Sequence, residues 1–129
     1  MNWVEKLIVA MEGSVGGILK IKVDNQVVQA LIQPEVIAFF KTNHAVLYKM
    51  GKQSFLDFLG LLQQNKRDEA FHLILQSMDA EDIIARMEMD TEELKEWNEN
   101  RERFNAALQD FALNVLAPSL IKVLTGLIV

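Results

Sequence analysis

The sequence holds one pair of residues with a spacing known from metal centres. Glu69 and His72 share the Glu-x-x-His spacing, which di-iron carboxylate bundles use on two helices, with a further Glu on each of two others. Here the spacing occurs once, and both side chains project opposite an apolar stripe of Phe71, Ile74 and Met78. A solvated pair on a polar helix face is therefore the favoured interpretation.

His44 is the second side chain that could do acid–base chemistry. It projects within an apolar helical arc, close to Phe40, Leu47 and Tyr48. A buried histidine can act as a general base with a shifted pKa. An acid–base site also needs a second oriented group, and the sequence identifies none near His44. We therefore favour a neutral core histidine that is hydrogen-bonded to a carbonyl.

Arg101 interrupts the apolar stripe of the longest predicted helix. It could bind a carboxylate or set the register between helices, as single polar residues do in coiled coils. The favoured interpretation is structural, with the arginine stem packed on Trp97 and the guanidinium in solvent.

The remaining sequence offers no motif for metal, cofactor or nucleophile chemistry. The chain has no cysteine and only two histidines, which argues against a zinc site within one chain. The acidic group of Glu88, Asp90, Glu92 and Glu93 lacks the oxygen spacing and the glycine of an EF-hand loop. No phosphate-binding glycine loop or nucleophile elbow is present. We therefore expect no catalytic residue, no metal and no cofactor, and a protein that is not an enzyme.

Charge is distributed unevenly along the 129 residues. The formal net charge is −5. Residues 68–102 contain twelve acidic and three basic side chains. This acidic middle argues against nucleic acid as a partner, because nucleic-acid binding requires neutralisation of phosphates. We expect protein partners instead.

A membrane role is not favoured either. The apolar stretch over residues 111–129 is interrupted by Asn114, Pro118 and Lys122, and a lysine inside a span costs about 3 kcal/mol. Contact with a membrane surface remains an alternative.

The absence of cysteine and of a recognisable signal peptide in the first residues leads us to expect a cytoplasmic protein.

The element that organises the chain is a predicted helix over residues 91–117. Asp90 can cap it, with Glu93 as a capping-box partner. One stripe on this helix follows alternating spacings of three and four, as in a bundle seam. It consists of Leu94, Trp97, Phe104, Leu108, Phe111 and Val115, with Arg101 as its single polar member. Shorter helices are predicted over residues 2–12, 34–50, 66–78 and 80–89. Two further helices are predicted to begin at Ser54 and at Pro118.

Residues 18–32 allow two interpretations. Leu19, Ile21 and Val23 alternate with lysines, which is the periodicity of a strand, and a turn at residues 24–25 would make a hairpin. A lone two-stranded hairpin is marginal, however, and no later segment has strand periodicity. Asp24 also suits the N-cap of a helix over residues 25–32. We favour the helix and keep the hairpin as the alternative.

These patterns predict an all-α fold, a single-domain helical bundle of about six or seven helices over residues 1–129. The leading function is a non-enzymatic interaction or assembly module that forms homo-oligomers, since nearly every helix has a wide apolar face. We expect a second copy to cover part of the last helix, through Leu120, Ile121, Leu124, Leu127 and Ile128.

Two other functions are kept as alternatives. One is a carrier or sensor with an apolar pocket between helices, lined by Phe39, Phe40, Phe55, Phe58, Phe71 and Met78. The other is an enzyme centred on His44 or on the Glu69/His72 pair.

Overall fold

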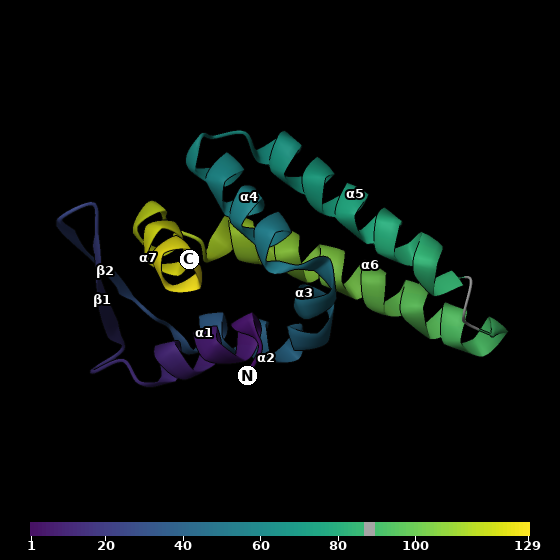
Figure 1. Ribbon diagram of the computed structural model, residues 1–129, viewed down its shortest axis with the longest axis horizontal. Coiled ribbons are helices and arrows are strands. Elements are labelled where there is room, and N and C mark those ends of the chain that lie inside the picture. Colours follow the sequence, from purple (N-terminus) through teal and green to yellow (C-terminus); the bar gives the residue numbers. More distant parts are fainter. Residues whose placement is uncertain (87–89) are drawn as a thin grey trace.

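The computed structural model describes the backbone of residues 1–86 and 90–129, and their side chains except at residues 79–86, 93 and 97. Within these ranges the fold has seven helices and one two-stranded antiparallel sheet (Figure 1). The prediction of a mostly helical chain is confirmed. The elements are α1 (Trp3–Glu12), β1 (Ile18–Val23), β2 (Gln26–Leu31), α2 (Pro34–Thr42), α3 (His44–Met50), α4 (Lys52–Gln63), α5 (Arg67–Arg86), α6 (Thr91–Asn114) and α7 (Pro118–Ile128).

Residues 18–31 form a β-hairpin, so the favoured helix over residues 25–32 is wrong. Val23 pairs with Gln26, and the two residues between them have positive φ, 49° at Asp24 and 63° at Asn25. A two-residue turn with both φ values positive is the type I′ turn that matches strand twist. Asp and Asn tolerate this conformation better than other residues with a side chain. Asp24 therefore turns the chain instead of capping a helix.

The hairpin is not isolated, because one of its faces lies against α7. Leu19, Ile21 and Val28 pack against the hydrophobic core from this inner face. The approach is close at Gly126 of α7, where a Cβ would overlap Ile21 Cδ1 and lie 3.2 Å from Val23 Cγ2. The helix thus supplies the packing partner that a lone hairpin lacks.

α7 is the central element of one half of the molecule. It contacts α1, α4 and both strands, and Figure 1 shows it between the hairpin and the other helices. Its apolar side chains are buried, with Val123 and Leu124 fully covered. Proline at its start supplies a φ that suits the first turn of a helix.

Two helix boundaries differ from the predictions. The predicted helix over residues 34–50 is divided at Asn43, whose side-chain amide donates to Phe39 O at 2.9 Å. Conversely, α5 continues from residue 67 to 86, so the predicted break between a helix over residues 66–78 and a second one over residues 80–89 is wrong.

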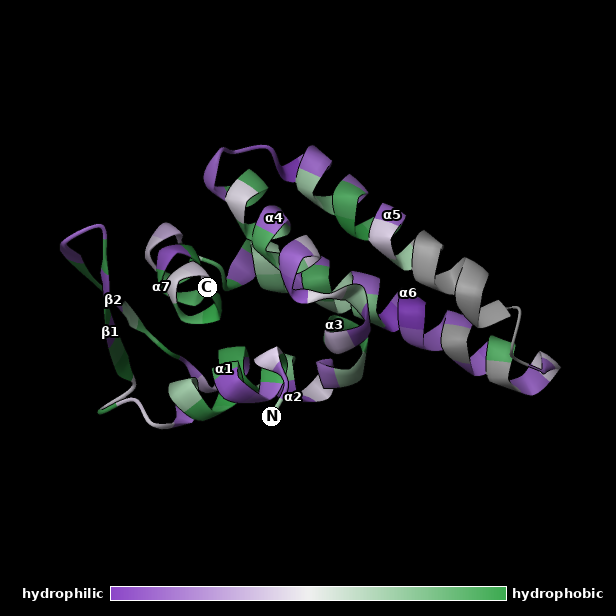
Figure 2. Ribbon diagram, viewed as in Figure 1, coloured by the Kyte–Doolittle hydropathy of each residue, from purple (hydrophilic) through white to green (hydrophobic). Residues whose placement is uncertain are grey.

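α5 and α6 run side by side and form an arm that extends away from the hairpin (Figure 1). The part of α6 near the body is anchored in the core by Phe104, Leu108 and Phe111, each 3% exposed or less, which confirms this half of the predicted seam. The part toward the tip is largely hydrophilic where Figure 2 colours it. Trp97 of the seam and Glu93 of the predicted capping box have side chains outside the described set. No described helix is both long and apolar enough to cross a membrane.

Candidate functional site

The phenylalanines predicted to line a pocket instead pack against one another. Phe39 stacks on Phe111 with ring centroids 4.1 Å apart, and Phe40 meets the rings of Phe39, Phe55 and Phe111 edge-on. Phe58 continues the cluster between Phe55 and Phe71. Rings at these separations are in direct contact. These side chains therefore form the core and do not surround a ligand-sized space.

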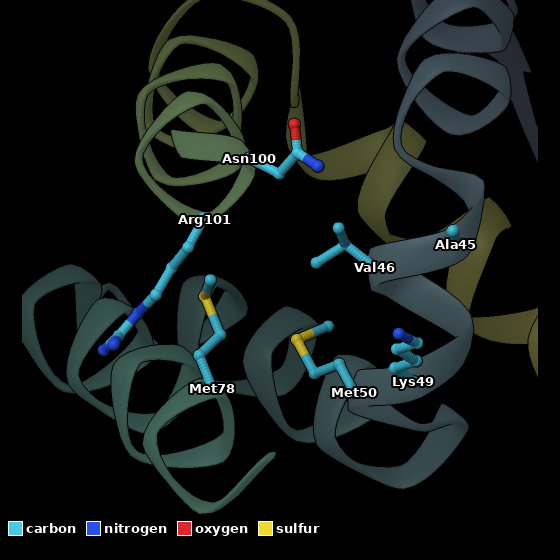
Figure 3. A pocket seen from close by; sticks show the side chains of 7 residues that line it. All are labelled: Ala45, Val46, Lys49, Met50, Met78, Asn100 and Arg101. Carbon is cyan, nitrogen blue, oxygen red and sulfur yellow. The ribbon is translucent and has the colours of Figure 1, made fainter. Parts of the chain in front are cut away.

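A small cavity lies elsewhere, between α3, α5 and α6 (Figure 3). Its volume is about 150 Å³. Met78 is the one predicted pocket residue among its described lining, which consists of Ala45, Val46, Lys49, Met50, Met78, Asn100 and Arg101. In Figure 3 the Val46 side chain and the two methionines lie around the hollow, and Arg101 extends away from it along α5.

The last helix does not present the surface that we predicted for self-association. Leu120, Ile121, Leu124 and Ile128 are buried within the chain itself, and Leu127 is half-buried. The hairpin, α1 and α4 cover them. We expected a second copy to cover this arc because nearly every other helix has a wide apolar face of its own to pair. In the structure, elements of the same chain cover the arc.

His44 is half-buried and joins two helices. Its Nε2 lies 3.2 Å from the Asn2 side-chain nitrogen, 3.3 Å from Asn2 Oδ1 and 3.6 Å from Glu5 Oε1. Asn2 Oδ1 also accepts the Glu5 amide N–H and so caps α1. The sequence did not identify these partners, because they are about forty residues away. The arrangement ties the start of α1 to the start of α3.

Glu69 and His72 are both exposed on α5. His72 Nε2 lies 3.2 Å from Gln76 Nε2, one turn further along the same helix. No group of three or more potential metal ligands occurs among the residues that the structure describes. The geometry agrees with the interpretation of a solvated pair.

The outer face of the hairpin is a further exposed feature. Side chains alternate along each strand, so the residues that do not face α7 point outward. They include Ile18, Val27 and Leu31, which are 46%, 69% and 58% exposed. Ile18 and Leu31 are directly paired across the strands. Figure 1 places the hairpin at one end of the molecule, with no other element beyond it.

We call Ile18, Lys20, Lys22, Val27, Gln29 and Leu31 the outer face of the hairpin. Sequence reasoning missed it because the segment was assigned to a helix. The signal was present in the alternation of Leu19, Ile21 and Val23 with lysines. Ile18 and Leu31 form an exposed aliphatic pair at one end of this face, and the polar pair of Lys20 and Gln29 separates them from Val27. Exposed apolar side chains that lie together mark interaction sites, and the Ile18–Leu31 pair is the apolar part of this face.

Comparisons of the chain with protein-family models, with curated proteins and with solved structures found no match.

Proposed function

We propose that this protein is a non-enzymatic interaction module that associates with further copies of itself through the hairpin. The observation that carries the proposal is the exposed outer face of the hairpin, where Ile18 and Leu31 are paired across the strands. The hairpin lies at one end of the molecule (Figure 1). Exposed aliphatics on a sheet gain free energy when a partner removes them from water, at about 25 cal/mol per Å². A two-stranded sheet is also stabilised when further strands extend it.

The other two functions have weaker support. The cavity of about 150 Å³ between α3, α5 and α6 is smaller than the roughly 300–1,000 Å³ typical of ligand pockets. Three larger hollows in the described part of the chain, of about 540–720 Å³, are lined mostly by exposed residues, whereas a carrier needs a pocket that encloses its ligand. For an enzyme, Glu5 supplies the second group near His44, but both Asn2 and Glu5 belong to the first turn of α1 and its cap. Their contacts support a structural role for this histidine.

The proposal is tested by replacing one exposed leucine with a charge. Leu31→Asp places a carboxylate on the outer face, and desolvating it against a second copy is costly. We expect light scattering to show a concentration-dependent increase in mass for the wild type, and a loss of association of at least about tenfold in the variant, equivalent to about 1.4 kcal/mol.

Leu113→Asp is the matched control. Leu113 lies on α6 and is 54% exposed, close to the 58% of Leu31, so both variants add the same charge at a similar exposure. We expect Leu113→Asp to associate like the wild type. A wild type that stays monomeric at millimolar concentration contradicts the proposal, as does an equal loss in both variants.

A further inference from the structure

The hydrogen-bond pattern of the hairpin determines which backbone groups point away from it. Ile32 N–H donates to Gly17 O, which extends the register of the ladder by one pair. Pairs in an antiparallel ladder alternate between bonded and non-bonded. Every second pair from Gly17 and Ile32 onward is therefore bonded within the hairpin. The intervening residues, Ile18, Lys20 and Lys22 on β1 and Val27, Gln29 and Leu31 on β2, direct their N–H and C=O groups to the outer edges.

The two edges differ in how they are protected. On β1, the Ile18 N–H is already used by Val15 O at 3.1 Å, and Lys20 and Lys22 add charge. Lysines on an edge strand oppose pairing with another strand. On β2, none of the six residues is charged. The outward groups of Val27, Gln29 and Leu31 accept or donate no hydrogen bond within the described part of the chain.

We infer that a second copy pairs with this chain along β2, antiparallel and about a two-fold axis at Gln29. The inference rests on the proposed self-association and specifies its strand, register and symmetry: the contact involves Val27, Gln29 and Leu31 of β2, and Ile18 on β1 lies outside it. Val27 then faces Leu31 of the second copy, Gln29 faces Gln29, and Leu31 faces Val27. Each of these pairs exchanges two backbone hydrogen bonds, about six in total. The result is a continuous four-stranded sheet.

The side chains fit this register. On the outer face, Val27 of one copy packs beside Leu31 of the other, an aliphatic pair, and the two Gln29 amides can hydrogen-bond to each other. No two like charges meet within the paired β2 strands. The equivalent pairing along β1 would bring Lys20 opposite Lys20, which is destabilising. Charge therefore favours β2 over β1 as the pairing edge and permits β2 to pair with its own copy.

The contact is small, because each copy contributes one strand of six residues. Specific stable interfaces bury about 1,200–2,000 Å² in total, more than one pair of short strands provides. We therefore expect an equilibrium between monomer and dimer that depends on concentration, and which a single substitution can shift.

Charges placed on the two-fold axis test the register. Gln29→Lys and Gln29→Glu each bring like charges face to face, so each variant alone should dimerise at least about tenfold more weakly than the wild type. An equimolar mixture of the two variants should form heterodimers, because the introduced lysine of one copy then meets the introduced glutamate of the other. Native mass spectrometry with one variant isotope-labelled identifies the heterodimer.

Gln26→Lys and Gln26→Glu are the matched controls. Gln26 lies on the same strand, next to the turn. In this register the Gln26 side chains of the two copies are far apart. Both controls should dimerise like the wild type, alone or mixed. If the Gln29 variants dimerise as the wild type does, while Leu31→Asp still abolishes association, the register is wrong and the proposed function stands. If the wild type does not associate, both are wrong.

A second pair of variants separates an effect on pairing from an effect on folding. Gln29→Pro and Lys20→Pro each remove an N–H that points outward, so neither deletes a bond of the hairpin, and proline is tolerated on such edges. With helical circular dichroism retained in both, Gln29→Pro should be monomeric and Lys20→Pro should dimerise. The reverse result would place the contact on β1 and overturn the inference.

Discussion

The absence of one side chain, at Gly126, sets how closely α7 approaches the hairpin. A Cβ at this position would overlap Ile21 Cδ1 and lie within 3.2 Å of Val23 Cγ2. Glycine inside a helix costs about 0.8–1.0 kcal/mol relative to alanine. The close packing of the inner face on α7 offsets that cost.

We expect Gly126→Ala to lower the free energy of unfolding by up to about 2 kcal/mol, since overpacking typically costs about 1–3 kcal/mol and the gain in helix propensity offsets about 0.8–1.0 kcal/mol of it. Chemical denaturation measures the change. Gly60→Ala is the control, because a Cβ at Gly60 of α4 meets nothing within 4 Å. That variant should be neutral or slightly more stable. A stabilised Gly126→Ala would contradict the described packing.

At the scale of elements, the apolar patterns in the sequence predicted most of the helices. Six of the seven described helices begin within about two residues of a predicted start, and the seam over Phe104, Leu108 and Phe111 is buried as expected. The spacing of apolar residues predicted these helices correctly, because the apolar face of a helix is determined by residues that are close together in the sequence. Helix interruptions were harder to predict, since the conformational preferences of single residues are weak and tertiary packing overrides them.

The hairpin was the principal error, and its cause is non-local. The strand alternation was visible, but a two-stranded hairpin was judged unstable without a third partner. That partner is α7, about a hundred residues away in the sequence. Once α7 and the hairpin are packed together, the arc that we assigned to self-association is internal and the outer face of the hairpin is exposed. The sequence contained the residues of the interaction surface, but it did not indicate which apolar faces would be covered.

The buried seam of α6 provides a test at this scale. Leu108 is 1% exposed, so Leu108→Ala should lower the free energy of unfolding by about 2–5 kcal/mol, as core truncations do. Leu113→Ala on the same helix, at a residue 54% exposed, should change it by less than about 0.5 kcal/mol. Similar losses in the two variants, measured by chemical denaturation, would mean that the buried face of α6 is wrongly assigned.

At the scale of the whole molecule, the hairpin and the segment richest in acidic residues by sequence are far apart (Figure 1). The hairpin is at one end, and the arm of α5 and α6 extends toward the other (Figure 1). Residues 68–102, which make up most of the arm, contain twelve of the eighteen acidic side chains.

Residue-resolved amide hydrogen exchange at low and high protein concentration tests the central claim most directly. The amides of Val28 and Ala30 are bonded within the hairpin and should be protected at both concentrations. The amides of Val27, Gln29 and Leu31 point outward, so they should exchange rapidly in the dilute monomer and become protected as concentration rises. Rapid exchange of these three amides at every concentration, in a sample that light scattering shows to be associated, would contradict pairing through β2.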